Sequence, residues 1–342
     1  MKDNIKDYED IVISTRVRLA RNIKDHRFPH LLQDEESKEI IEIFQNAMES
    51  VDPDKKFDFQ RMSEVNSVGR RMLMEDHLVS PELNKNKEIS AYFLHKDRKV
   101  NLLINEEDHL RLQVLNDDFT LRENLNRARE IEEQLEKKIN FAFDDKYGYL
   151  TTCPTNAGTG LRASIMVHLP ALREADYMEG LQDSLNKLGI TVRGFYGEGS
   201  KASGDLYQIS NQQTLGISEQ MLVEKIENIA HRIVMNERNV RARTLEKHPV
   251  KIKDKVFRSL GVLKYARQIG EEEAFECLSN LRMGIDLGLY QGLGFKQMNE
   301  MMKKVQKYTV LNYKYDLKSY KEEDVIRADW IRDFIKKEEI FE

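Results

Sequence analysis

Residues 11–19 read Ile11-Val-Ile-Ser-Thr-Arg-Val-Arg-Leu19, and their polarity alternates from Ile13 onward. The odd positions are apolar or β-branched, whereas Ser14, Arg16 and Arg18 occupy even positions. This period of two predicts a strand that buries one of its faces. The two arginines then share the opposite face of that strand.

Two more stretches resemble this one. Within residues 100–114, even positions carry the apolar Val100, Leu102, Ile104, Leu110, Leu112 and Val114, and odd positions carry Glu107, His109 and Arg111. We therefore expect a strand whose polar face holds these three side chains together. A further strand is expected over residues 163–169, after a glycine-rich turn.

Helices are expected between and after these strands. Thr120 and Glu123 fit a capping box ahead of an apolar helical stripe, and another helix should begin near Ser218. Strand patterns end near residue 240, after which the sequence predicts amphipathic helices over residues 253–268, 271–281, 295–305 and 323–336. The pattern favours an α+β domain over residues 1–240, followed by a smaller all-helical domain over residues 241–342.

The composition limits the classes of function. The 342 residues include 54 Lys and Arg against 59 Asp and Glu, a net charge of −5, which argues against direct nucleic-acid binding. Cys153 and Cys277 lie far apart, so a disulfide scaffold and a cysteine-based zinc site are excluded. The chain has no apolar run of membrane-spanning length and a polar N-terminus. We expect a cytoplasmic protein without a membrane anchor.

Two strand faces are candidates for binding an anion. The guanidinium groups of Arg16 and Arg18 repel each other unless an anion lies between them, and a polyphosphate suits such a pair. Glu107 beside Arg111 could orient a substrate while the arginine holds a phosphate. Each pattern also fits a simpler explanation, namely a solvated edge strand or an ordinary surface ion pair.

Two glycine-rich loops are further candidates. In residues 152–162, glycines let backbone N–H groups approach an anion, and Arg162 follows them at once. Cys153 precedes this turn, either as a packed small residue or as a thiol that lines a pocket. The loop over residues 193–201 begins at Arg193 and contains Glu198, although such loops are often only turns.

Together these segments predict a phosphate-binding cage in a chain of negative net charge. Such a cage would neutralise a nucleoside triphosphate and stabilise a phosphoryl group in transfer. Its members are the arginines that lie on strand faces and at glycine turns: Arg16, Arg18, Arg111, Arg162 and Arg193.

Four ordered motifs resemble those of the phosphagen (guanidino) kinases. They read Ser14-Thr-Arg-Val-Arg18, Asn105-Glu-Glu-Asp-His-Leu-Arg111, Cys153-Pro-Thr-Asn-Ala-Gly-Thr-Gly-Leu-Arg162 and Ile209-Ser-Asn-Gln-Gln-Thr-Leu-Gly216. The resemblance covers about residues 11–240 and implies an antiparallel sheet flanked by helices. Within the superfamily, the bacterial protein arginine kinases are the most similar, because of the loop that begins at Arg193, the short stretch before Ser14 and the helical C-terminal domain.

The resemblance implies a role for each motif. Glu107 would be the catalytic carboxylate, Glu198 a second acidic residue and Cys153 the active-site cysteine. A guanidinium has a very high pKa, so a carboxylate must accept and orient its protons. The implied ATP contacts are Ser14, Thr15, Arg16, Val17, Arg18, His77, Arg111, Arg162, Ala163, Ser164, Ile165, Met166, Arg193, Gly194, Phe195, Tyr196, Gly197 and Glu198. Mg²⁺ is implied through the nucleotide, with no protein ligand set.

The resemblance also extends to a C-terminal motif, Arg-Asp-x-x-Arg-Ala, that binds phosphoarginine and couples activity to it. Here Asp324 and Arg327 are retained, but Glu323 replaces the first arginine, so weaker allosteric binding is expected. An exposed helical ion pair is the simpler reading.

For the cell, the resemblance implies ATP-dependent phosphorylation of arginine side chains that marks proteins for degradation in a stress response. The implied partners are the repressor CtsR, the activator McsA and the Clp protease, with a homodimer formed through the helical domain. The alternatives are a kinase of small guanidino compounds and a non-catalytic adaptor that recognises phosphoarginine.

Overall fold

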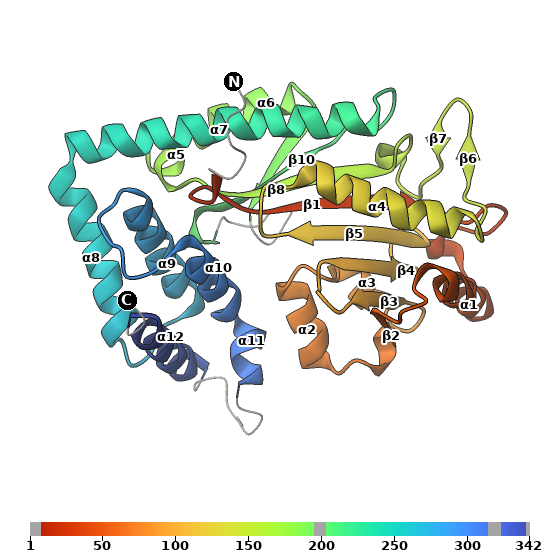
Figure 1. Cartoon of the computed structure of the whole chain (residues 1–342), viewed down its shortest axis with the longest axis horizontal. Helices are drawn as coiled ribbons and strands as arrows, with labels where there is room; N and C mark the ends of the chain where they lie inside the picture. Colours follow the sequence, from red (N-terminus) through yellow and green to blue (C-terminus); the bar gives the residue numbers. More distant parts are fainter. Residues whose placement is uncertain (1–7, 195–202, 314–322, 340–342) are drawn as a thin grey trace.

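The computed structural model describes residues 8–194, 203–313 and 323–339. Its centre is an antiparallel sheet of eight strands in the order β2-β3-β4-β5-β1-β8-β10-β9 (Figure 1). The strands are β1 Val12–Arg21, β2 Phe57–Arg61, β3 Ala91–His95, β4 Val100–Ile104, β5 Leu110–Asn116, β8 Leu161–His168, β9 Ile190–Gly194 and β10 Leu206–Asn211. A small hairpin joins β6 Phe143–Asp144 to β7 Gly148–Tyr149. The expected α+β class and antiparallel sheet are confirmed.

The central strand β1 forms where its alternation predicts it. Val17 and Leu19 are fully buried, whereas Arg16 and Arg18 are half-buried on the other face. β1 lies between β5 and β8, so its side chains have neighbours from two strands. The arginine-bearing face of the sheet is therefore defined from the middle outward.

Residues 100–114 form a hairpin rather than one strand. β4 ends at Ile104, β5 starts at Leu110, and these two residues pair across the turn, as Val100 pairs with Val114. Cross-strand partners here have residue numbers with a constant even sum, so the hairpin and a single strand give the same alternation. The expectation that His109 stands beside Arg111 is wrong. His109 is fully buried in the turn, where its Nδ1 accepts a hydrogen bond of 3.0 Å from the backbone N–H of residue 23.

Three helices cover the apolar face of the sheet: α1 Asp34–Val51, α4 Leu121–Glu136 and α7 Glu219–Lys247 (Figure 1). α4 and α7 begin where the sequence predicts. Ser218 caps α7 by accepting a hydrogen bond from the Met221 backbone N–H at 3.3 Å. The expected capping box of α4 is absent, because the Thr120 hydroxyl lies near Thr15 and Asn124 instead.

Two short helices cover part of the arginine-bearing face. α2 Ser67–Glu75 and α3 Pro81–Lys85 pack over β3 and β4 through a separate apolar cluster that includes Leu73, Leu83 and Leu103. This cluster covers only one end of the sheet. The part of the face that holds the arginines of β1, β5 and β8 is left for the site.

Helices follow one another after α7, as expected: α8 Pro249–Tyr265, α9 Glu271–Asp286, α10 Phe295–Lys304, α11 Lys307–Asn312 and α12 Glu323–Glu339. α8, α9, α10 and α12 form a second hydrophobic core that also includes Ile13, Met166 and Leu206 from the sheet. Residue 240, the predicted domain boundary, lies inside α7, whose earlier residues belong to the first core. No helix in the described part of the chain is long and apolar enough to cross a membrane.

Buried polar groups join the two cores. Arg241 on α7 binds Glu237 through Nε at 2.8 Å and Asp286 on α9 through Nη1 at 2.9 Å. His168 at the end of β8 lies 2.8 Å from the Ser279 hydroxyl of α9. Breaking one of these contacts would leave a buried charge without its partner, which costs free energy. The network therefore holds the helical domain firmly against the sheet.

Candidate active site

A cavity of about 760 Å³ opens on the arginine-bearing face of the sheet. It lies between the sheet, α2 and the helical domain. Eight of the residues singled out from sequence line it together: Arg16, Arg18, His77, Glu107, Arg111, Cys153, Arg162 and Arg193. Segments that are distant in sequence therefore supply one concave site.

The arginines of this cavity crowd one another. Arg18 and Arg162 are direct cross-strand partners, an arrangement that like charges disfavour. Burial lowers the pKa of Arg16 to about 10, with added repulsion from Arg162 and Arg111. Burial and the charge of Arg16 also lower the pKa of Arg18, and its buried Nε has no hydrogen-bond partner among the described residues. This unpaired donor and the mutual repulsion fit a bound polyanion such as a triphosphate.

Glu107 lies at this cavity beside a second, buried carboxylate. Arg111 bridges the two, with Nη1 2.5 Å from Glu106 Oε1 and Nη2 2.9 Å from Glu107 Oε2. Ser80 also donates a hydrogen bond to Glu106. Burial raises the pKa of Glu107, while Arg111 lowers it and the carboxylates of Asp108 and Glu106 raise it. A carboxylate of raised pKa accepts a proton more readily, as general-base chemistry requires.

Asp108 connects the turn that carries Glu107 to the loop that carries Cys153. Its Oδ1 accepts hydrogen bonds of 2.7 Å from the Asn22 side chain and from the Thr152 backbone N–H. Cys153 follows at once, with its Sγ 3.0 Å from the Thr155 hydroxyl. The thiol and Glu107 are thus carried on loops that one buried carboxylate ties together.

A smaller hollow continues from the cavity past Arg16 and His77. Residues from two of the segments expected to contact ATP, 14–18 and 162–166, line this hollow, including Ser14, Ser164 and Met166. Burial, together with Arg16, Lys303 and Arg18, lowers the pKa of His77 to about 3. His77 is therefore neutral near pH 7, when it can donate through one ring nitrogen and accept through the other.

Other residues of the expected ATP segments face away from the cavity. Thr15, Val17, Ala163 and Ile165 are buried toward the covering helices, and the Thr15 hydroxyl donates to the Asp118 carbonyl at 2.7 Å. Alternation along a strand imposes this, so only their backbone can face a ligand. Gly194 ends β9, whereas Phe195, Tyr196, Gly197 and Glu198 lie outside the described residues.

The C-terminal motif lies in the helical core, and its Arg327 is fully buried. Arg327 donates to the carbonyls of Val305 and Ile269 at 2.7 and 2.8 Å and lies 2.5 Å from Asp324 Oδ1. The Arg327 guanidinium therefore ties α12 to the chain ahead of α9 and after α10. The simple reading of an exposed ion pair is wrong for this arginine.

Sequence reasoning missed the contribution of the helical domain to the cavity. Glu271, Lys307 and Tyr308 line its wall, opposite Arg71 and Glu75 of α2. No pattern in the sequence signals this contact, because it joins residues more than 230 positions apart. Glu106, by contrast, belongs to the motif of residues 105–111, but only the structure reveals its ion pair with Arg111.

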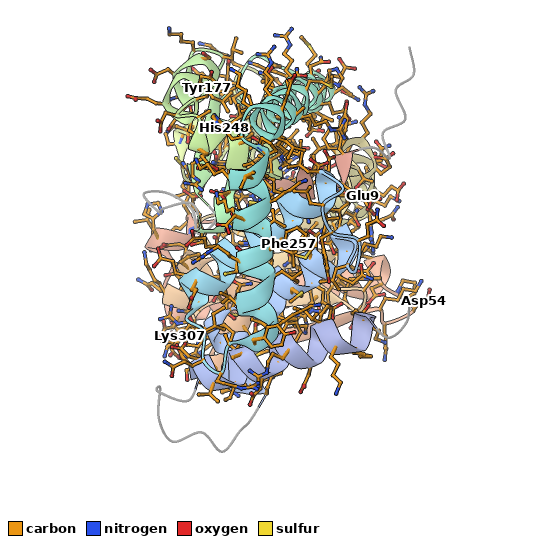
Figure 2. The ribbon with its side chains drawn as sticks, turned by 90° about the vertical axis from the view of Figure 1, so that its left-hand side faces the viewer. Glu9, Asp54, Tyr177, His248, Phe257 and Lys307 are labelled. Atoms are coloured by element: carbon orange, nitrogen blue, oxygen red, sulfur yellow. The ribbon has the colours of Figure 1, made fainter. Side chains whose placement is uncertain are left out.

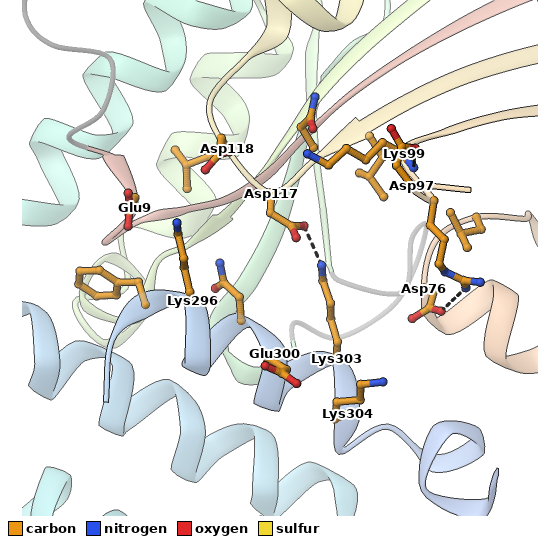
Figure 3. A pocket seen from close by; sticks show the side chains of 17 residues that line it. Glu9, Asp76, Asp97, Lys99, Asp117, Asp118, Lys296, Glu300, Lys303 and Lys304 are labelled. Carbon is orange, nitrogen blue, oxygen red and sulfur yellow. Dashed lines mark hydrogen bonds and ion pairs between the residues drawn. The ribbon is translucent and has the colours of Figure 1, made fainter. Parts of the chain in front are cut away.

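A second cavity, of about 580 Å³, lies between α10 and the far end of the same sheet face (Figure 3). Lysines 296, 303 and 304 of α10 face a wall that includes Asp76, Asp117 and Asp118. Lys303 and Asp117 form an ion pair of 2.7 Å across it. The arginine cage and Glu107 lie outside this cavity. The described residues also contain no group of three or more His, Cys, Asp or Glu side chains arranged to hold a metal ion.

Comparison with known families places this geometry in context. Residues 39–240 match the model of the ATP:guanido phosphotransferase C-terminal catalytic domain, and residues 249–340 match that of the protein-arginine kinase McsB C-terminal domain. A protein-arginine kinase of Geobacillus stearothermophilus is 42% identical over 96% of this chain and 91% of its own. One of Halalkalibacterium halodurans is 43% identical, over 96% of this chain and 93% of its own.

Solved structures agree on the fold. A lombricine kinase superimposes with a TM-score of 0.60 at 25% identity and covers 68% of each chain. A duplicated taurocyamine kinase from Schistosoma mansoni superimposes with a TM-score of 0.59 at 26% identity, over 69% of this chain and 35% of its own. The expected similarity to phosphagen kinases, and to their protein-arginine kinase branch, is confirmed.

Proposed function

The chain belongs to the ATP:guanido phosphotransferase family and to its protein-arginine kinases, and from this premise we propose that it phosphorylates arginine side chains of proteins. The observation that carries the proposal is one cavity that combines the five cage arginines with Glu107 and Cys153. The phosphoryl donor would be ATP, bound with its phosphates among Arg16, Arg18, Arg111, Arg162 and Arg193.

The arginine cage has two tasks in this reaction. It binds the triphosphate against a mutual repulsion that is already present, so phosphate binding relieves an electrostatic cost. It also stabilises charge on the oxygens of the transferring group, which is the main demand of phosphoryl transfer. Mg²⁺ would be bound through phosphate oxygens and water and would neutralise part of this charge.

Glu107 would orient the substrate guanidinium and accept its proton. A guanidinium nitrogen forms a bond to the γ-phosphorus, the bond from that phosphorus to the β–γ bridging oxygen breaks, and ADP departs. The nitrogen loses one proton, which Glu107 accepts. The raised pKa of Glu107 favours this transfer, and Arg111 holds the carboxylate in place at 2.9 Å.

A kinase of small guanidino compounds is the second candidate. The solved relatives named above favour it, since they are lombricine and taurocyamine kinases. The protein-arginine kinase relatives support the first candidate more strongly, because their identity is higher and extends through the helical domain. The non-catalytic adaptor is not supported, since Arg327 is buried and Glu107 lies within an arginine cage.

Incubation with Mg-ATP and either an arginine-containing protein or free arginine tests the proposal. We expect acid-labile phosphoarginine on the protein, and its loss in Glu107→Gln with ATP binding retained. Glu133→Gln, an exposed carboxylate on α4, is the matched control and should remain active. Phosphorylation of free arginine alone would refute the proposal in favour of the second candidate.

We further propose that the reaction occurs in the cytoplasm, marks proteins for degradation by a Clp-type protease and controls the stress-response repressor CtsR, with McsA as activator. These roles rest on the family resemblance. A homodimer formed through the helical domain is proposed as well. α8 exposes Val250 and Tyr265 near its two ends. Phe257 is exposed between them (Figure 2). Phe257→Asp should then shift the mass measured by light scattering from dimer to monomer.

A further inference from the structure

The cavity has one wall that is built across the two domains. Glu75, at the end of α2, accepts hydrogen bonds of 2.8 Å from the backbone N–H groups of Tyr308 and Thr309 and from the Thr309 hydroxyl. Glu271 of α9 accepts one from the Lys307 backbone N–H at 3.1 Å. These contacts hold the first turn of α11 against α2 at the mouth of the cavity.

These hydrogen bonds limit how the carboxylates of the wall can bind a substrate. Both of its carboxylates, Glu75 and Glu271, are engaged by backbone donors of α11. The third carboxylate among the described residues that line the cavity is Glu107, which the reaction requires. A substrate cation that passes this wall therefore finds fewer free acceptor positions on these two carboxylates, although both keep their negative charge.

The cations of the same wall are placed differently. Arg71 on α2 is exposed, and its guanidinium carbon lies 5.6 Å from the centre of the Tyr308 ring. Among the described residues, Arg71 forms no ion pair with a carboxylate. Lys307 also lines the cavity and lies 3.8 Å from Glu323. A planar guanidinium that rests on an aromatic ring keeps its edge donors available for a carboxylate.

We propose that Arg71, supported by Tyr308, selects protein substrates in which the target arginine has an acidic neighbour. The target guanidinium enters the cavity toward Glu107, so the adjoining residues of the substrate chain pass over the wall. A glutamate or aspartate there pairs with Arg71, whereas a lysine is repelled. This inference rests on the proposed protein kinase function and adds a substrate preference to it.

Arg71 should affect the binding of the substrate rather than the rate of phosphoryl transfer. Arg71 does not contact the reacting atoms, and an exposed ion pair changes an affinity by a small factor. We expect kcat/KM to be about five-fold higher for an acidic than for a basic neighbour, with the difference in KM and a similar kcat. The preference should weaken as salt concentration rises, because the wall is open to solvent.

The experiment compares peptides that contain one arginine flanked on both sides by glutamate, by alanine or by lysine. The unaltered protein should prefer the glutamate peptide, Arg71→Ala should lose this preference, and Arg71→Glu should prefer the lysine peptide. Arg258→Ala is the matched control, because Arg258 is exposed on α8 and away from the cavity. Its preference should equal that of the unaltered protein.

Three results would overturn the inference. Equal kcat/KM for all three peptides would remove the preference itself, while leaving the proposed function intact. A preference that persists unchanged in Arg71→Glu would assign it to other residues. Phosphorylation of none of the peptides, but of free arginine, would refute the proposed function and the inference with it.

Discussion

Glu106 should control both the position and the basicity of Glu107. Its carboxylate is almost fully buried and accepts from Arg111 at 2.5 Å, while Arg111 also holds Glu107. Replacing Glu106 by Gln preserves the shape of the side chain and removes its charge. Arg111 then pairs with Glu107 alone, and the repulsion from Glu106 is lost, while burial and Asp108 still raise the pKa of Glu107. Both changes lower the pKa of Glu107 and make it a weaker base.

The size of the effect follows from the lost hydrogen bond. A hydrogen bond to a charged group contributes about 1.5–3 kcal/mol, against about 1 kcal/mol for a neutral one. The difference of about 0.5–2 kcal/mol corresponds to a decrease in kcat of about two- to thirty-fold. The acid limb of the kcat profile, where Glu107 becomes protonated, should move to lower pH.

The assay is steady-state kinetics with Mg-ATP and an arginine substrate across the pH range, with thermal unfolding as a check on folding. Glu133→Gln is again the control, since it removes an exposed carboxylate far from the turn. An acid limb that stays in place or moves to higher pH, in a folded protein with unchanged kcat, would refute this account of Glu106.

Three further predictions concern the ionisable side chains of Arg18, His109 and Arg327. Arg18→Met should raise the unfolding temperature, because it relieves repulsion with Arg16, and should weaken ATP binding about ten- to hundred-fold in calorimetry; tighter binding would contradict this. His109 has a pKa lowered to about 4, mainly by burial, so the stability that it contributes is complete above its unfolded pKa of about 6.5 and is lost as pH falls toward 4. His109→Gln should therefore reduce the slope of unfolding free energy against pH in this window by roughly 1 kcal/mol per unit, and an unchanged slope in denaturant titrations would exclude the idea. Arg327→Ala leaves two buried carbonyls without their donor and should destabilise the helical domain by about 3 kcal/mol, measured by the fluorescence of the single tryptophan, Trp330; a loss below 1 kcal/mol would count against this structural role.

Much of the fold was predictable because burial follows local periodicity. The alternation of β1 and the stripe of α7 each report one apolar face, and both elements form as predicted. The β4–β5 hairpin shows the limit, since cross-strand partners preserve the parity of a single strand. Only the turn at residues 105–109, which buries His109, distinguishes the two.

The sequence by itself predicted which side chains meet in the cavity. The cage arginines, Glu107 and Cys153 each lie in a local motif, on a strand face or at a tight turn. Only the tertiary structure decided which arginines pair with a buried carboxylate and which line the cavity. Arg21 belongs to the same strand as Arg16, yet it is buried against Glu132 and beneath Tyr149 and does not line the cavity. It also decided that α2 and α11 form a shared wall with Arg71 at its edge. The physical reason is that periodicity records which face a residue occupies, whereas the partner that neutralises a charge arrives from any distance along the chain.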